Sequence, residues 1–323
     1  MTITIINPNN NYPLHLNGDH LVDCLGNALP IVNGVPRIAD LENYTKNFGF
    51  QWNKFNRTQL DRESDGLDLS RRRFFAETRW DREDLAGKDI LEVGSGAGRF
   101  SKVVLEHTKG TLYSVDYSDA VSANYRNNYH IAPERFKLFQ ASIYELPFPD
   151  NSFDKVFCVG VLQHTPHFES SVRALISKAK PGGEVVVDFY PINGWWTKLS
   201  AKYIFRPFTK RMSHERLLEW IEANIEWLLN ADRVLHRIGL GVLARFLPIV
   251  DTQRTLPKYL SKSDVREWAI LDTFDMFSPE YDNPQRIEDV AAMFRRCGAK
   301  VTFAGFEHFD GLSAAVVRGI KQE

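Results

Sequence analysis

The chain is poor in cysteine and contains no long apolar run. Its 3 cysteines, Cys24, Cys158 and Cys297, lie far apart and form no C-x-x-C pair, which disfavours a disulfide framework and a cysteine zinc site. No uncharged apolar stretch approaches the roughly 18 residues of a membrane-spanning helix. The first residues lack the basic and apolar regions of a signal peptide. We therefore expect a cytoplasmic protein with no metal and no stable membrane insertion.

A surplus of charge of either sign is also missing. Lysine and arginine together number 40, aspartate and glutamate number 41, and the isoelectric point is near 6.8. A nucleic-acid-binding domain is usually distinctly basic, so this balance disfavours a nucleic-acid partner. The 323 residues are enough for one α/β domain with about a hundred residues of further structure.

The most informative stretch is KDILEVGSGAGRF, residues 88–100. Its first half reads as a buried strand, and glycines then stand at alternate positions from Gly94 to Gly98 before a helical apolar pattern. A glycine-rich turn between strand and helix lets the backbone approach a ligand closely. The next predicted strand, TLYSVD, ends at Asp116, whose carboxylate can bind two ribose hydroxyls. A dinucleotide fingerprint would need glycine where this chain has Arg99.

Three further segments extend this pattern: LPFPDNSFDKVFCVGVLQHT (146–165), KPGG (180–183) and the strand EVVVDFY after it. Together with E-V-G-S-G-A-G they resemble the class I S-adenosylmethionine-dependent methyltransferases, over residues 86–190 and again near the C-terminus. The resemblance implies a Rossmann-like, seven-stranded, mostly parallel sheet whose last strand is antiparallel. The strand–helix alternation from residue 88 onward independently predicts a parallel α/β sheet with helices on both faces.

The same resemblance implies S-adenosyl-L-methionine as the cofactor. Asp116 matches the ribose-binding carboxylate, and Tyr117 would flank the adenine. Family members often have aspartate after the third strand, where this chain has Ser142 followed by Ile143. The cofactor-binding residues implied in this way are Glu92, Gly94, Ser95, Gly96, Asp116, Tyr117, Ser142, Ile143 and Val159.

The segment before the core has two parts. Residues 1–40 contain short strand-like runs and end in LPIVNGVPRI, which resembles zinc-ribbon-like domains. Those ribbons usually have four cysteines, so with Cys24 alone we expect a degenerate ribbon-like unit without zinc. Residues 41–85 would form a helical lead-in over the cofactor, including a helix over 70–85.

An aromatic stripe at helical spacing runs through residues 42–61. It either packs on the main domain or brings one aromatic over the cofactor, and Gln51 and Trp52 are the candidates for that contact. The string NFGFQWNKFNRTQLD resembles methyltransferases of surface-polysaccharide and other secondary biosynthesis. Trp52 is therefore also predicted to contact the substrate.

Residues 192–283 interrupt the α/β alternation between two core segments, 86–191 and 284–323. HERLLEWIEANIEWLLN places its leucines and isoleucines on one helical face. A membrane-surface helix is one interpretation, but a helical cap is favoured, because a cap buries that face within the same chain. We expect this cap insertion to form the acceptor site.

Methyl transfer is an in-line displacement that needs a base only if the acceptor is a hydroxyl or a protonated amine. His164 in GVLQHTPHF is the candidate base, and the competing, slightly favoured interpretation is a structural histidine that fixes its loop. Tyr190 would contact the acceptor. Residues 270–285 read as a functional loop that adds Asp272 and Tyr281 to the substrate site.

These patterns predict methyl transfer to a small-molecule acceptor such as a sugar or a nucleotide sugar. The alternative is a cofactor-binding regulatory or structural protein without turnover. An RNA methyltransferase is disfavoured by the neutral charge.

Overall fold

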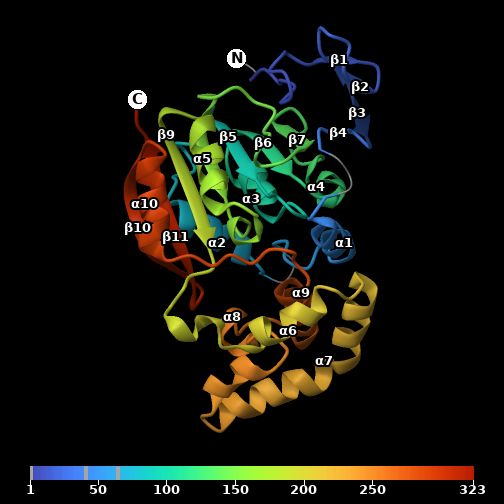
Figure 1. Ribbon diagram of the computed structural model, residues 1–323, viewed down its shortest axis with the longest axis vertical. Coiled ribbons are helices and arrows are strands. Elements are labelled where there is room, and N and C mark those ends of the chain that lie inside the picture. Colours follow the sequence, from blue (N-terminus) through green and yellow to red (C-terminus); the bar gives the residue numbers. More distant parts are fainter. Residues whose placement is uncertain (1–2, 40–42, 63–65) are drawn as a thin grey trace.

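The computed structural model describes residues 3–39, 43–62 and 66–323, and its core is a seven-stranded sheet in the order β10-β11-β9-β8-β5-β6-β7 (Figure 1). The strands from β9 to β7 in this order are parallel, and β11 runs antiparallel to both of its neighbours. The predicted fold class is therefore confirmed, including the antiparallel last strand. The bounds are β5 Asp89–Val93, β6 Thr111–Asp116, β7 Phe136–Gln140, β8 Phe153–Cys158, β9 Ala179–Phe189, β10 Ala299–Phe309 and β11 Leu312–Lys321.

Helices cover both faces of this sheet. Ile90 and Leu91 of β5 are both buried, but on opposite faces, because successive side chains of a strand alternate. Ile90 packs in a cluster with side chains of α2, α3 and α4, whereas Leu91 packs with α5 and α10. This two-sided burial explains why the central strands are apolar throughout. The bounds are α2 Leu69–Thr78, α3 Arg99–His107, α4 Ala120–Asn128, α5 Phe168–Lys178 and α10 Ile287–Arg296.

A small antiparallel sheet precedes the core. It comprises β1 His15–Asn17, β2 His20–Val22, β3 Ala28–Val32 and β4 Val35–Pro36 in sequential order. The Asp23 carboxylate accepts side-chain hydrogen bonds from Asn7, Asn10 and Asn27 at 2.9, 2.7 and 2.9 Å. These bonds lower the pKa of Asp23 far below its usual value. A polar cluster thus joins the loops of this unit, in which Cys24 is exposed.

A helical cap lies below the carboxyl ends of the parallel strands (Figure 1). Its longest helix, α7, buries the predicted apolar face, including Leu218, Ile221 and Ile225, against α9. The short helix α1 contacts α4 of the core and α9 of the cap, so it lies between the two layers. The bounds are α1 Lys46–Lys54, η3 Trp195–Lys198, α6 Ala201–Thr209, α7 His214–Arg237, η4 Gly241–Phe246, α8 Thr252–Thr255 and α9 Lys262–Phe277.

Two local predictions were wrong. Residues 270–277, expected to be part of a loop, form the last turns of α9, because Ile270, Phe274 and Phe277 recur at helical spacing and are buried in the cap. The helix expected over 70–85 ends at Thr78, since Arg79 adopts a left-handed backbone with φ of 57°.

Among the described residues, none of the helices is both long enough and apolar enough to span a lipid bilayer.

Candidate functional site

A cavity of about 690 Å³ lies between the carboxyl edge of the sheet, α1 and the cap. Such an edge, where β5 has β6 on one side and β8 on the other, is the usual ligand position in an open α/β sheet. The lining combines residues from the glycine-rich loop, from α1 and from the cap, which are far apart in sequence. The fold therefore assembles one site from several segments.

The glycine-rich loop forms one wall of this cavity. Gly94 and Gly96 have positive φ values of 83° and 54°, which favour glycine. A Cβ on Gly94 would lie 2.2 Å from the side chain of Val161, and one on Gly96 would lie 3.1 Å from Trp52 Nε1. Both positions therefore need glycine for close packing, and the Trp52 indole lies directly against the loop.

Asp116 ends β6 next to this loop. Its Oδ2 accepts a hydrogen bond from the Gly96 N–H at 2.7 Å, and its Oδ1 accepts from the Ser118 N–H at 2.8 Å and the Ser118 hydroxyl at 2.6 Å. Burial nevertheless raises the pKa of the Asp116 carboxyl. The carboxylate thus both holds the glycine-rich loop through the Gly96 amide and lines the cavity.

Glu92 is placed differently from the other residues of the same motif. It is buried beneath the loop, outside the cavity lining, and its Oε2 accepts hydrogen bonds from the hydroxyls of Ser101 and Ser114. Burial raises the pKa of Glu92 to about 7. Glu92 thus links the strand below the loop to α3 and β6. It would affect a ligand in the cavity through the position of the loop and not through direct contact.

Aromatic and aliphatic side chains line the cavity beyond Asp116. Tyr117 and Ile143 belong to this wall, and the Tyr44 ring packs edge-on against Tyr117 with centroids 5.4 Å apart. Ser142 lies outside the lining, where its hydroxyl accepts a hydrogen bond from the Tyr144 N–H at 3.2 Å. The wall can therefore hold a flat apolar ring, and Ser142 serves the local turn.

A buried cluster of charges forms the end of the cavity near α2. Arg73 pairs with Glu77 at 2.7 Å and with Asp188, and Asp188 also accepts a hydrogen bond from the Gly160 N–H. Burial raises the pKa of Glu77 to about 7. Because Arg73 and Asp188 both line the cavity, this end presents a guanidinium and a carboxylate to a ligand.

A second polar chain connects the core to the cap. Arg99 donates to Gln59 Oε1 at 2.7 Å, and the Gln59 side-chain amide donates to Asp272 Oδ1 at 3.2 Å. Burial lowers the pKa of Arg99 to about 10 and raises the pKa of Asp272 to about 7. All three side chains line the cavity, so a ligand can form hydrogen bonds with them where the core meets α9.

His164 and Tyr190, which follow the core strands β8 and β9, meet Asp275 of the cap helix α9 at the cavity. The Tyr190 hydroxyl donates to Asp275 Oδ2 at 3.2 Å, and His164 Nε2 lies 3.8 Å from the same oxygen. His164 Nδ1 is 3.1 Å from the carbonyl oxygen of Tyr281, so this nitrogen carries the proton when the ring is neutral. Burial lowers the pKa of His164, and its Nε2 has no hydrogen-bond partner among the described residues. The Nε2 lone pair is therefore available to accept a proton.

Most of the predicted site residues come together in the cavity, with three exceptions. Glu92, Ser142 and Tyr281 lie outside its lining, and Tyr281 approaches through its backbone carbonyl. The predicted residues that line the cavity are Trp52, Gly94, Ser95, Gly96, Asp116, Tyr117, Ile143, Val159, His164, Tyr190 and Asp272.

Sequence reasoning did not assign a role in the site to Asp188, Gln59 or Arg99. A charged residue inside the apolar strand EVVVDFY was a signal for Asp188, because a buried charge needs a partner or a ligand. Nothing in the local sequence distinguishes Gln59. Its role depends on residues more than two hundred positions away, since it bonds to Asp272.

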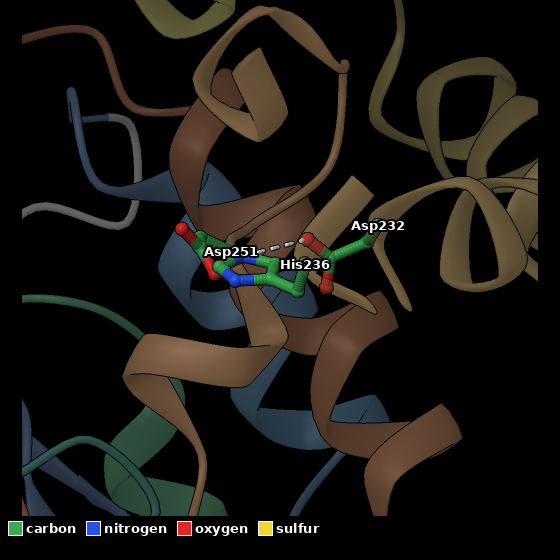
Figure 2. Close-up of side chains that lie close together, drawn as sticks. All are labelled: Asp232, His236 and Asp251. Atoms are coloured by element: carbon green, nitrogen blue, oxygen red, sulfur yellow. Dashed lines mark hydrogen bonds and ion pairs between the residues drawn. The ribbon is translucent and has the colours of Figure 1, made fainter. Parts of the chain in front are cut away.

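Among the described residues, one group could hold a metal ion, and it lies in the cap (Figure 2). His236 Nε2 is 2.9 Å from Asp251 Oδ1 and 3.6 Å from Asp232 Oδ1. Asp232 also accepts hydrogen bonds from the backbone and the hydroxyl of Thr252. These contacts tie the end of α7 to α8, outside the cavity lining.

Comparison with known proteins identifies the core. Residues 91–187 match the family model described as a methyltransferase domain. The chain is 32% identical over 113 residues to a tRNA U34 carboxymethyltransferase of Nautilia profundicola, covering 34% of this chain and 37% of that protein. It is 31% identical over 133 residues to a ubiquinone biosynthesis O-methyltransferase of Pseudomonas fluorescens, covering 39% and 56%. The chain thus spans between about a third and somewhat over a half of these relatives' lengths.

A solved structure of magnesium protoporphyrin IX methyltransferase from Synechocystis aligns with 86% of this chain and 96% of its own length, with a TM-score of 0.49 and 13% identity. Residues 91–187 therefore match a methyltransferase domain, and the strand order and the glycine-rich loop agree with the class I, S-adenosylmethionine-dependent fold that the sequence resembles.

Proposed function

We propose that this protein transfers a methyl group from S-adenosylmethionine to a small polar acceptor bound between the core and the cap. The observation that carries the proposal is a single cavity whose walls hold two kinds of chemistry. One wall has the glycine-rich loop and Asp116, and the other has His164, Tyr190 and Asp275. A ligand that fills both parts would bring a cofactor and an acceptor side by side, and holding them in line is the main task of methyl transfer.

The residues of the first wall fit the cofactor. The loop at Gly94 and Gly96 is packed so closely that a Cβ would displace Val161 or press on Trp52, which leaves its backbone facing the cavity. Asp116 would accept hydrogen bonds from the ribose hydroxyls, and Tyr117 and Ile143 would flank the adenine. Arg73 would attract the carboxylate of the methionine part. When bound, S-adenosylmethionine supplies an electrophilic methyl group and a neutral leaving group.

His164 is the proposed base if the acceptor is a hydroxyl. Its Nδ1–H is held by the Tyr281 carbonyl, which keeps the Nε2 lone pair directed away from that loop. Because burial lowers the pKa of His164, the ring is neutral at pH 7 and can accept a proton at Nε2. Asp275, 3.8 Å away, would stabilise the imidazolium so formed. The same Nδ1 contact also fits the structural interpretation, in which His164 fixes its loop.

The lining of the cap favours a polar acceptor. Lys202, Arg254 and Asn193 reach the cavity from the cap, beside Asp272 and Gln59. Side chains that can both donate and accept hydrogen bonds suit a polyhydroxylated ligand, and the two basic groups suit a phosphate. A sugar or a nucleotide sugar combines both features.

The test is release of S-adenosylhomocysteine in the presence of candidate nucleotide sugars and of a fractionated metabolite extract. We expect release that depends on one acceptor fraction and that falls at least about a hundredfold in Tyr190→Phe/Asp275→Asn, with cofactor affinity unchanged. A protein that binds the cofactor and releases no product with any fraction would instead be a binding protein without turnover.

RNA is the second candidate acceptor, and the relatives named tRNA U34 carboxymethyltransferases are the observation that favours it. Their similarity covers about a third of each chain. Filter binding of bulk tRNA at low salt, followed by transfer of a labelled methyl group, distinguishes the two acceptors. Labelled tRNA would replace the sugar proposal.

A further inference from the structure

The cap exposes many apolar side chains on three neighbouring elements, η3, α6 and η4. Trp195 is 83% exposed, Phe208 70% and Val242 59%, although side chains of these types are usually buried. Arg245 of η4 donates a hydrogen bond to the Trp196 carbonyl of η3, and α6 contacts η4. The three elements therefore lie side by side. The exposed apolar residues of this face are Trp195, Trp196, Leu199, Ile204, Phe205, Phe208, Val242, Leu243 and Phe246.

Helix α6 turns its charged side toward the protein and its apolar side toward solvent, which is the reverse of an ordinary surface helix. Its charged residues point inward: Lys202 pairs with Asp282 at 2.7 Å, and the Arg206 guanidinium donates to the Pro279 carbonyl at 2.8 Å. Its apolar residues Phe205 and Phe208 point outward. Because the inward charges are bonded to the chain, the helix cannot turn its apolar side inward without breaking these contacts. The exposed face is thus a fixed feature of the cap.

The segments that carry this face are basic, although the whole chain is nearly neutral. Residues 189–214 contain five lysines and arginines and no aspartate or glutamate, and residues 233–250 contain three arginines and no acidic residue. Lys198, Lys210 and Arg211 of the first segment are exposed, and Lys210 also pairs with Glu280 at 3.5 Å. A surface that combines aromatic and aliphatic side chains with lysine and arginine matches the composition of helices that lie in a membrane interface.

We propose that η3, α6 and η4 form a peripheral docking face for an anionic lipid surface. The apolar side chains would enter the boundary between headgroups and acyl chains, and the basic residues would attract the negative headgroups. A second copy of this chain fits the face less well, because a symmetric contact would bring two basic surfaces together. RNA offers phosphates for the basic residues and bases that stack on aromatic rings, but it offers no apolar phase for the aliphatic side chains Leu199, Ile204 and Val242.

This inference goes beyond methyl transfer, because it concerns where the protein acts. Lys202 belongs to α6 and also lines the cavity, so the docking face and the proposed acceptor site lie on the same layer of the molecule. An acceptor at a membrane surface would therefore approach the cavity from the cap.

Vesicle flotation tests the proposal with the full chain and needs no turnover, so its outcome is separate from that of the methyl-transfer assay. The probes are vesicles of phosphatidylcholine alone and vesicles with about a third phosphatidylserine. We expect binding to the anionic vesicles, weaker binding to the neutral ones, and partial release by salt. The variant Phe205→Ser/Phe208→Ser should lower binding at least about tenfold, since two signals are needed for stable attachment.

The matched control is Trp227→Ser. Trp227 is 50% exposed on α7, but its neighbours in sequence include Glu222 and Glu226 rather than lysine or arginine. The control should bind vesicles as the unchanged protein does. All variants alter exposed side chains, and their thermal unfolding and S-adenosylhomocysteine binding should stay unchanged, which shows that they are folded.

Absence of binding to anionic vesicles by the folded protein would overturn the proposal. So would equal binding by Phe205→Ser/Phe208→Ser and the unchanged protein. Light scattering measures the oligomeric state and so tests whether a second copy covers this face. If the unchanged protein is a dimer, the double variant is a monomer and neither binds vesicles, the face is a contact between copies. Retention of tRNA on filters without vesicle binding, lost in Lys210→Glu/Arg211→Glu, would make it an RNA surface.

Discussion

Replacing Asp116 by alanine tests the proposed cofactor site most directly. The carboxylate lines the cavity and accepts hydrogen bonds from the N–H groups of Gly96 and Ser118 and from the Ser118 hydroxyl. In Asp116→Ala a bound ribose would lose a charged acceptor, and the glycine-rich loop would lose the bond that holds the Gly96 amide. Both changes act on cofactor binding.

The magnitude follows from the number of bonds lost. Two ribose hydroxyls bound to one carboxylate contribute about 1.5–3 kcal/mol together, so affinity should fall about ten- to a hundredfold or somewhat more. Isothermal titration with S-adenosylhomocysteine measures this loss. Asp116→Asn keeps the shape and one acceptor oxygen, so its affinity should lie between those of Asp116→Ala and the unchanged protein.

Asp119 offers a control three positions away. Its side chain is 53% exposed, pairs with Arg37 at 3.0 Å and lies outside the cavity lining. Asp119→Ala should leave the affinity within about twofold, because this side chain does not line the cavity. Unchanged affinity in Asp116→Ala, measured on a protein whose thermal unfolding is normal, would refute the ribose assignment.

Four further predictions concern other parts of the molecule. Burial lowers the pKa of His164, so the unfolded chain binds a proton below about pH 6.5 that the folded chain excludes; thermal stability should therefore decline as the pH falls through that value, and less so in His164→Gln. Trp52→Ala removes the indole that packs on Gly96 and should weaken S-adenosylhomocysteine binding about five- to tenfold by titration. Gly98→Ala would place a Cβ 2.1 Å from the Asn124 side chain at φ of 87°, and should lower the free energy of unfolding in urea by about 2 kcal/mol or more. Elemental analysis of the purified, tag-free protein should find no zinc bound to the N-terminal unit, because Cys24 is its lone thiol.

Three of these predictions have internal checks. The pH dependence of His164→Gln would equal that of the unchanged protein if the pKa of His164 were the same in the folded and the unfolded chain, which would contradict its burial. Trp52→Phe should bind better than Trp52→Ala if an aromatic face is what the ligand needs. Gly66→Ala is the control for Gly98→Ala, since Gly66 also has a positive φ, of 68°, but its Cβ would meet no atom within 4 Å.

Local sequence was sufficient to predict the core and the loop of the candidate site. Gly94, Gly96 and Asp116 lie within one strand–turn–helix–strand unit, so their proximity follows from a short stretch of chain. The alternation of apolar strands with helices predicted the covered sheet, and the spacing of Leu218, Ile221 and Ile225 predicted the buried face of α7. In each case the sequence pattern lies in the same short segment as the residues whose burial it predicts.

The remaining features depended on contacts between distant segments. Arg73 meets Asp188 across 115 positions, and Gln59 meets Asp272 across 213, so neither residue carries a local mark of its partner. The apolar residues Ile270, Phe274 and Phe277 lie among aspartates, and their sequence alone predicts a loop, because the surface on which they pack as a helix is supplied by α7. The orientation of α6 was likewise decided by tertiary contacts: Asp282 and the Pro279 carbonyl bind its charges on the inner side, and the apolar side therefore faces outward.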